Sequence, residues 1–237
     1  ASLPVAIIPN CAANRHIHFK MQGEGPIKLK PPNLEIWPKA VWTPQENITR
    51  VNLDTLEKND LGQFKLGQNL LLSGKILTAR DAAHKKLKEL ADNNQTLPGN
   101  LNLKNRFIYY VGPVDPVGNE VVGPAGPTTS SRMDKYSSII LEDYGVIGMI
   151  GKAERGKETI NCIKKNKAIY LIAVGGSAYL ISQAIKSSKL IAFPELGMEA
   201  IYEFEVKDMP VTLAINTDGD SLHEEGVKKW KAVLMES

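Results

Sequence analysis

The order of apolar and polar positions after residue 50 predicts strands that alternate with helices. Apolar runs predict strands at about 69–78 and in the segments "RFIYYVGP", "VIGMIGKA" and "AIYLIAVGGSA". Stretches with one apolar face predict helices from about residue 81, over about 129–144, and in "GKETINCIKKN" and "AYLISQAIKSS". Because strand and helix alternate three times, we expect an α/β domain built in layers around a mixed sheet.

The two ends of the chain differ from this regular middle. Residues 1–50 are rich in proline and show no clear period, which indicates an extended segment that joins another part of a longer protein. The apolar start lacks the basic region of a signal peptide. We therefore expect a junction over 1–50 and a domain over 51–237. Near the C-terminus, "EAIYEFEVKDMPVTLAINTDG" predicts a β-hairpin with an Asp-Gly turn, and "SLHEEGVKKWKAVL" predicts a final helix.

Composition excludes several classes of protein. A net charge of +3, with Lys and Arg interleaved among Asp and Glu, does not indicate a nucleic-acid or membrane surface. The apolar runs are short and broken by glycine, so no transmembrane helix is expected. No zinc-ligand spacing, P-loop, Rossmann or G-x-S-x-G motif is found in the sequence. The two cysteines lie far apart; a disulfide is not expected, and Cys162 is predicted to be a small core residue.

Loops that follow strands carry the sites of open α/β sheets, and the first such loop here is "TARDAAH". Arg80 stands just before the predicted helix, where Asp81 is expected to be the N-cap. The simpler interpretation is that Arg80 is solvated and that His84 lies on the helix surface. The alternative is that Arg80 belongs to an anion site.

Two further loops favour the anion site. In "GPTTSSRMD", Thr128 or Thr129 could cap the next helix, but Arg132 follows on the same face, and the backbone N–H groups at a helix start bind anions. In "IGKAERGKE", Lys152 follows a glycine at a strand end. Basic residues at three successive strand ends could bind a small dianion together.

Five segments resemble one known family when they are taken in order. They are "TARDAAHKKLKE", "GPTTSSRMDKY", "IGKAERGKE", "VGGSAYL" and "FPELGMEAIYEFEVKDMP". Together they resemble the C-terminal half of class I fumarate hydratases, the iron–sulfur-dependent fumarases. The resemblance implies a swivelling β/β/α layered domain that closes over a four-iron four-sulfur cluster carried by the other half. It also implies a dicarboxylate substrate, a homodimer of the full enzyme and a cytoplasmic location, or a mitochondrial one in a eukaryote.

The resemblance also implies the roles of individual residues. Contacts to the substrate carboxylates fall on Arg80, Thr128, Arg132 and Lys152. Thr128 is the expected proton-transfer residue, and Thr129 takes that role if the register differs by one.

One cluster ligand is implied within this chain. Cys11 matches one of three cysteines that hold the cluster and leave one iron open as a Lewis acid. The other two ligands are expected on the N-terminal cluster-bearing half or subunit, so the isolated chain is expected to be inactive.

Three functions stay open at this point. The first is the reversible hydration of fumarate to malate. The second is dehydration of tartrate or another hydroxy-diacid on the same fold; the alanines in "RDAAH" favour fumarate over this alternative. The third is a non-catalytic anion-binding module.

Overall fold

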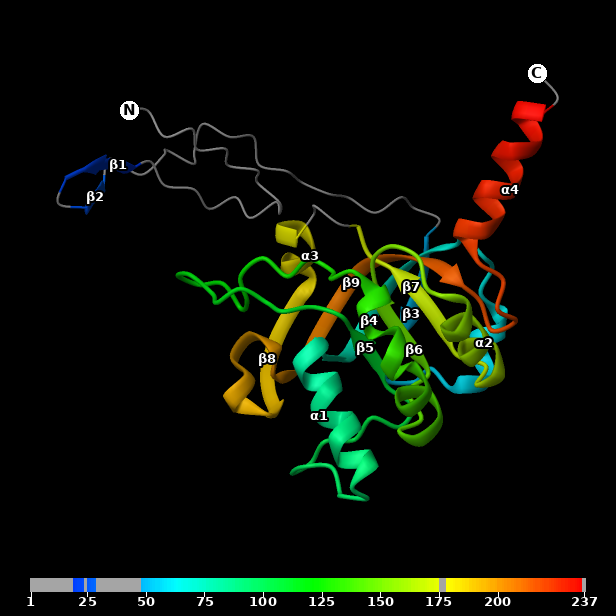
Figure 1. Cartoon of the computed structure of the whole chain (residues 1–237), viewed down its shortest axis with the longest axis horizontal. Coiled ribbons are helices and arrows are strands. Elements are labelled where there is room, and N and C mark those ends of the chain that lie inside the picture. Colours follow the sequence, from blue (N-terminus) through cyan, green and yellow to red (C-terminus); the bar gives the residue numbers. More distant parts are fainter. Residues whose placement is uncertain (1–18, 24, 29–47, 175–177, 236–237) are drawn as a thin grey trace.

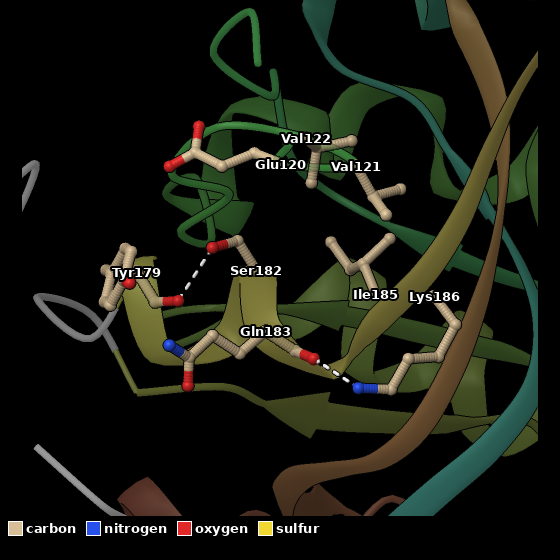
Figure 2. A pocket seen from close by; sticks show the side chains of 8 residues that line it. All are labelled: Glu120, Val121, Val122, Tyr179, Ser182, Gln183, Ile185 and Lys186. Atoms are coloured by element: carbon tan, nitrogen blue, oxygen red, sulfur yellow. Dashed lines mark hydrogen bonds between the residues drawn. The ribbon is translucent and has the colours of Figure 1, made fainter. Parts of the chain in front are cut away.

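The computed structural model of the chain describes residues 19–23, 25–28, 48–174 and 178–235 (Figure 1). Two short strands, β1 (Phe19–Gln22) and β2 (Gly25–Lys28), form an antiparallel pair. The extended segment expected over 1–50 lies mostly outside the described residues. The domain division at residue 50 therefore stays a prediction.

The main body contains one mixed sheet of seven strands: β3 (Thr49–Asn52), β4 (Asn69–Thr78), β5 (Phe107–Tyr109), β6 (Gly148–Gly151), β7 (Ile169–Ile172), β8 (Ile185–Ala192) and β9 (Ile201–Ile215). The strands lie in the order β3-β4-β5-β6-β7-β9-β8. Neighbours from β3 to β7 run parallel, whereas β9 is antiparallel to β4, β7 and β8. Because β9 pairs with both β4 and β7, the strands from β4 to β7 close into a ring with β9. The predicted α/β class and mixed sheet are confirmed.

Helices connect and cover these strands. The α-helices are α1 (Asp81–Asp92), α2 (Lys157–Lys165), α3 (Ala178–Ala184) and α4 (Leu222–Met235). The 3-10 helices are η2 (Lys58–Gln63), η3 (Ser130–Tyr136) and η5 (Pro194–Glu199), and η4 (Ile139–Asp143) is a π-helix. Figure 1 shows α4, in red, extending away from the sheet. No helix in the described ranges is long and apolar enough to cross a membrane.

The core lies on both faces of the parallel strands. Phe107 and Tyr109 of β5 belong to one cluster of buried side chains, and Ile108 and Tyr110 belong to a second cluster. Successive residues of a strand point to opposite faces, so both faces of β5 are covered, as is usual for a parallel strand. Apolar residues of the helices that follow the parallel strands complete the second cluster: Leu87, Met133 and Ile163.

The segment that predicts a β-hairpin is instead one strand of 15 residues, β9. The predicted Asp-Gly turn is present but follows this strand, where the Gly219 N–H donates to the carbonyl of Asn216 at 3.1 Å. Asp208 has a φ of 53°, and its N–H donates to the Ser73 Oγ at 3.1 Å. The pairing with β4 shifts register between Leu72 and Gly74 at this point. The chain therefore bends at Asp208 without reversing, and β9 pairs first with β8 and then with β7.

Two predicted helices also differ in the structure. The stretch 129–144 contains the 3-10 helix η3 and the π-helix η4 in place of one regular α-helix. The helix predicted in "AYLISQAIKSS" ends at Ala184, where β8 begins. Ser188 then lies opposite Phe204, so pairing with β9 prevails over the helical preference of the sequence.

Close packing between β5 and β6 generates a prediction about Gly148. This residue lies opposite Phe107, and a Cβ at position 148 would lie 2.1 Å from the Phe107 Cε1 atom. We expect Gly148→Ala to lower the free energy of unfolding by roughly 1–3 kcal/mol, because the buried ring cannot move without strain. Urea unfolding followed by circular dichroism measures this change.

Gly226→Ala is the matched control for Gly148→Ala. An added Cβ at position 226 meets no atom within 4 Å, and alanine favours a helix such as α4 more than glycine does. This variant should be at least as stable as the unaltered chain. If Gly148→Ala unfolds at the same urea concentration as the unaltered chain, the packing described for β5 and β6 is wrong.

Candidate functional site

Three neighbouring parallel strands end at one edge of the sheet, and the predicted site lies there. Arg80 follows the end of β4 by two residues, and Lys152 directly follows the end of β6. Strand β5 lies between these two strands. Because the carboxyl ends of parallel strands meet at the same edge, the loops after β4, β5 and β6 share one side of the domain.

A short backbone segment, residues 128–130, lies between the ends of β5 and β6. The Thr128 N–H donates to the carbonyl of Tyr110 at 2.7 Å, and the Lys152 N–H donates to the carbonyl of Thr128 at 3.3 Å. The Ser130 N–H then donates to the carbonyl of Lys152 at 3.1 Å, and Thr129 bridges to Lys152 as in a parallel pair. The structure thus brings Thr128, Thr129 and Lys152 together.

The two threonine hydroxyls do not act as helix caps. Thr129 is the N-cap of η3, but its side chain makes no capping hydrogen bond. Within the described ranges, neither hydroxyl has a hydrogen-bond partner in the protein. Both residues are half-buried, so part of each residue is accessible to solvent.

Arg132 is held by a carboxylate from a different element. Its Nη2 lies 3.1 Å from the Oδ2 of Asp81, and both side chains are partly exposed, at 48% and 39%. Asp81 was expected to be the N-cap of α1, but the N-cap is Arg80 and Asp81 is the first helical residue. The ion pair connects the start of α1 to η3 and brings Arg132 to the same edge as Arg80.

Arg80 has its own carboxylate partner, Glu199. The Arg80 Nη2 lies 3.5 Å from the Glu199 Oε1, and the Glu199 Oε2 accepts the Ala82 N–H at 2.9 Å. The Arg80 side chain also packs closely against Gly112, where an added Cβ would lie only 2.6 Å from the Arg80 Nη1. Its Nε atom is buried and has no hydrogen-bond partner among the described residues.

A fully buried arginine lies beneath this edge. The Arg155 guanidinium lies between the rings of Tyr110 and Tyr170, 5.4 and 5.1 Å from their centroids. Its Nε donates to the Asp134 carboxylate at 2.6 Å, and its Nη2 donates to the Ser137 Oγ at 3.1 Å. This charge is compensated within the domain and is not exposed to a ligand.

Tyr170 connects the buried arginine to the lysine loop. The Tyr170 hydroxyl lies 2.8 Å from the Ser130 Oγ and 2.9 Å from the carbonyl of Ala153, and the Lys152 N–H donates to the same Oγ at 3.1 Å. Burial raises the pKa of Tyr170, so the phenol keeps its proton. Ala153 has a φ of 64°, an unfavourable conformation for alanine. The bond to its carbonyl therefore helps to hold the loop that presents Lys152.

Close packing against Ser130 explains why the residue before Lys152 is a glycine. A Cβ at Gly151 would lie 1.9 Å from the Ser130 Oγ, so only glycine allows residues 128–130 to pack against β6. Ser130 and Asp134, both in η3, contact residues outside that helix. The Ser130 Oγ accepts the Lys152 N–H, and the Asp134 carboxylate accepts the Arg155 Nε–H. The sequence holds no local signal for either contact, because both partners lie about 20 residues away.

His84 was expected on the helix surface, and this expectation is wrong. The imidazole is buried between the rings of Tyr110 and Tyr136, and its Nδ1 lies 2.8 Å from the carbonyl of Arg80. Burial lowers the pKa of His84 to about 4. The neutral ring therefore donates from Nδ1 to the Arg80 carbonyl and supports the first turn of α1.

The cysteines give no metal site in the described part of the chain. Cys11, the expected cluster ligand, lies outside the described residues. Cys162 is half-buried against the second core cluster, and burial raises the pKa of its thiol. In the described ranges, no group of three His, Cys, Asp or Glu side chains could hold a metal ion.

Two arginines, a lysine and two unbonded hydroxyls thus lie around one edge of the sheet. This arrangement defines an α/β domain suited to bind a small anion at the carboxyl ends of its parallel strands. The family model described as "Fumarase C-terminus" matches residues 23–226, and the chain belongs to this family.

Curated relatives agree with this membership. The anaerobic class I fumarate hydratase of Escherichia coli K12 is 35% identical over 97% of this chain and 43% of its own length. Fumarate hydratase 2 of Leishmania major is 33% identical over 94% of this chain and 40% of its own length. A putative L(+)-tartrate dehydratase subunit beta of Methanocaldococcus jannaschii is 36% identical over 73% of this chain and 91% of its own length. The chain therefore spans less than half of these fumarate hydratases.

The buried imidazole generates a prediction about pH. The pKa of a histidine in an unfolded chain is about 6.5, whereas the pKa of His84 in the folded chain is about 4. Between these two pH values, His84 binds a proton in the unfolded chain but stays neutral in the folded chain, which favours unfolding. The stability that the neutral ring contributes is complete above pH 6.5 and is lost as the pH falls towards 4. Between pH 7 and 5 we expect His84 to account for a loss of about 2 kcal/mol in the free energy of unfolding.

Urea unfolding at pH 7, 6 and 5, with and without His84→Gln, measures this contribution. Glutamine can still donate to the Arg80 carbonyl but does not titrate. The variant should lose less stability than the unaltered chain over this range. An identical pH dependence in both chains would show that His84 is not the group responsible.

Proposed function

We propose that this chain is the C-terminal half of an iron–sulfur hydro-lyase that interconverts fumarate and malate. The observation that carries the proposal is the grouping of Arg80, Thr128, Arg132 and Lys152 at one edge of the sheet. Membership of the fumarase C-terminus family supports it, as do relatives named class I fumarate hydratases.

Each of the four residues has a chemical task in this proposal. Arg80 and Arg132 bind the substrate carboxylates, and the Lys152 ammonium adds a third positive charge. These charges stabilise the negative charge that builds on a carboxylate when the neighbouring carbon loses its proton. The Thr128 hydroxyl, which has no partner among the described residues, exchanges that proton with the substrate carbon. Thr129 is the alternative for this step.

The cluster and the partner belong to the same proposal. The described residues offer no ligand set for a four-iron four-sulfur cluster. Cys11 would supply one thiolate, and the N-terminal cluster-bearing half would supply the other two. The relative named a subunit beta supports a partner that can be a separate chain.

The finer architecture is also proposed. We infer that the body over 48–235 is the swivelling β/β/α domain of the family, since a parallel part of the sheet from β4 to β7 meets an antiparallel part around β9. A homodimer of the assembled enzyme and a cytoplasmic or mitochondrial location follow from the resemblance to class I fumarases.

Tartrate is the second candidate substrate. The M. jannaschii relative, named a putative L(+)-tartrate dehydratase subunit beta, is 36% identical over 73% of this chain, against 35% over 97% for the E. coli fumarate hydratase. Fumarate and tartrate reactions share a dicarboxylate and the removal of a carbon-bound proton. The residues at the sheet edge therefore suit both substrates, and turnover decides between them.

The experiment assembles this chain with its N-terminal half under anaerobic conditions and reconstitutes the cluster. We expect hydration of fumarate to malate, which is measured by the loss of fumarate absorbance. We expect little dehydration of tartrate. Arg132→Ala should lower kcat/KM at least a hundredfold, because a charge-assisted contact to the dianion is lost. An intact cluster without turnover of either substrate would contradict an enzymatic function.

Arg50→Ala is the matched control for Arg132→Ala. Arg50 is also a partly exposed arginine in an ion pair, with Asp208 at 3.3 Å, but it lies on β3. Its loss should leave kcat/KM within about twofold of the unaltered enzyme, because surface ion pairs contribute little to stability. Equal losses in both variants would point to a general charge effect and not to substrate binding at Arg132.

A further inference from the structure

The two arginines of the site are neutralised by carboxylates of the protein itself. Asp81 lies 3.1 Å from Arg132, and Glu199 lies 3.5 Å from Arg80. A dicarboxylate that approaches this edge therefore meets arginines that already have partners. The two carboxylates differ in how firmly they are held, and this difference decides which of them a ligand can replace.

Glu199 is fixed by more than its ion pair. Its second oxygen accepts the Ala82 N–H at 2.9 Å, at the start of α1, where backbone N–H groups and the helix dipole favour a negative charge. Arg80 and Glu199 are also the less exposed pair, at 20% and 25%. Loss of Glu199 from this position would leave a backbone donor unsatisfied, so it is suited to hold Arg80 in place.

The ion pair between Asp81 and Arg132 is more exposed and has fewer supporting contacts than the pair between Glu199 and Arg80. Arg132 is its one ion-pair partner in the described ranges, and the two side chains are 39% and 48% exposed. An exposed ion pair of this kind costs little to break. If Arg132 turns away, Asp81 still lies in the first turn of α1, where its charge is stabilised by the helix start.

We propose that Asp81 is an exchangeable counter-ion of Arg132, which a substrate carboxylate replaces, whereas Glu199 is the fixed counter-ion of Arg80. Asp81 thus competes with the substrate and sets how tightly the site binds dicarboxylates. This inference rests on the proposed function for the identity of the substrate.

The test compares the unaltered chain with Asp81→Asn. In the 237-residue chain, a succinate titration followed at the Arg132 Nε–H by NMR gives the dissociation constant. In the assembled enzyme, fumarate kinetics give KM and kcat. Asp81→Asn should lower both the succinate dissociation constant and KM by about two- to fivefold, with kcat nearly unchanged, because the internal competitor is gone.

Asp92→Asn is the matched control for Asp81→Asn. It removes the same charge from the other end of α1, where Asp92 pairs with Lys88 at 2.8 Å, and it should change neither constant. A purely structural role of Asp81 predicts the opposite sign, since a weakened start of α1 would raise KM. An unchanged or raised dissociation constant in Asp81→Asn overturns the exchange, and so does a titration in which succinate never shifts the Arg132 signal.

The outcomes also separate this inference from the proposed function. If Asp81→Asn tightens succinate binding but the assembled enzyme converts neither fumarate nor tartrate, the exchange stands and the hydro-lyase proposal fails. If fumarate is hydrated and Asp81→Asn leaves both constants unchanged, the hydro-lyase proposal stands and the exchange fails.

Discussion

The hydrogen bonds that hold residues 128–130 between the ends of β5 and β6 are the constraint on which the candidate site depends. They join Thr128 to Tyr110 on one side and to Lys152 on the other. This segment can fit only because position 151 is a glycine, whose missing side chain leaves space for Ser130. The threonine hydroxyls and the lysine thus take their places from backbone pairing within the sheet, and not from the caps of a helix.

The buried charge beneath the site has a different role from the charges at its edge. A buried guanidinium is costly unless its hydrogen bonds are satisfied, and Arg155 meets this condition through Asp134, Ser137 and two aromatic rings. The hydroxyl of one of these residues, Tyr170, also contacts the Ser130 Oγ and the carbonyl of Ala153, whose backbone has a positive φ. A shift of Arg155 would therefore displace Tyr170 and, through it, the loop that contains Lys152. We interpret the arginine as a rigid support for the loop.

Local periodicity was enough to predict the parallel strands β4 to β7 and the helices α1, α2 and α4, because each has a pattern of its own. It did not predict β3, which lies where the junction over 1–50 was expected to end. It failed at β9, where the sequence predicts a β-hairpin, because the continuity of this strand depends on pairing with β4 across more than 100 residues. It failed for His84 as well, since burial of that ring requires Tyr110 and Tyr136 from later in the chain.

In the candidate site, too, residues with a local sequence signal were predicted and a residue that depends on distant contacts was not. Arg80, Arg132 and Lys152 were identified because each follows a predicted strand end or helix start. Glu199, which binds both Arg80 and the first turn of α1, was missed, because nothing in its neighbourhood distinguishes it from a solvated glutamate.

The exposure of the edge charges weakens the attraction that they can exert on an anion. Two unit charges 4 Å apart attract by about 1 kcal/mol in water, but by about 4 kcal/mol where the effective dielectric constant is near 20. Arg132 is nearly half exposed here, so water screens its attraction for a carboxylate. A second surface that covers this edge would remove that water and strengthen every contact of the dianion at once. In the proposed enzyme, such a cover would let the same residues bind the dianion more tightly than the exposed edge can.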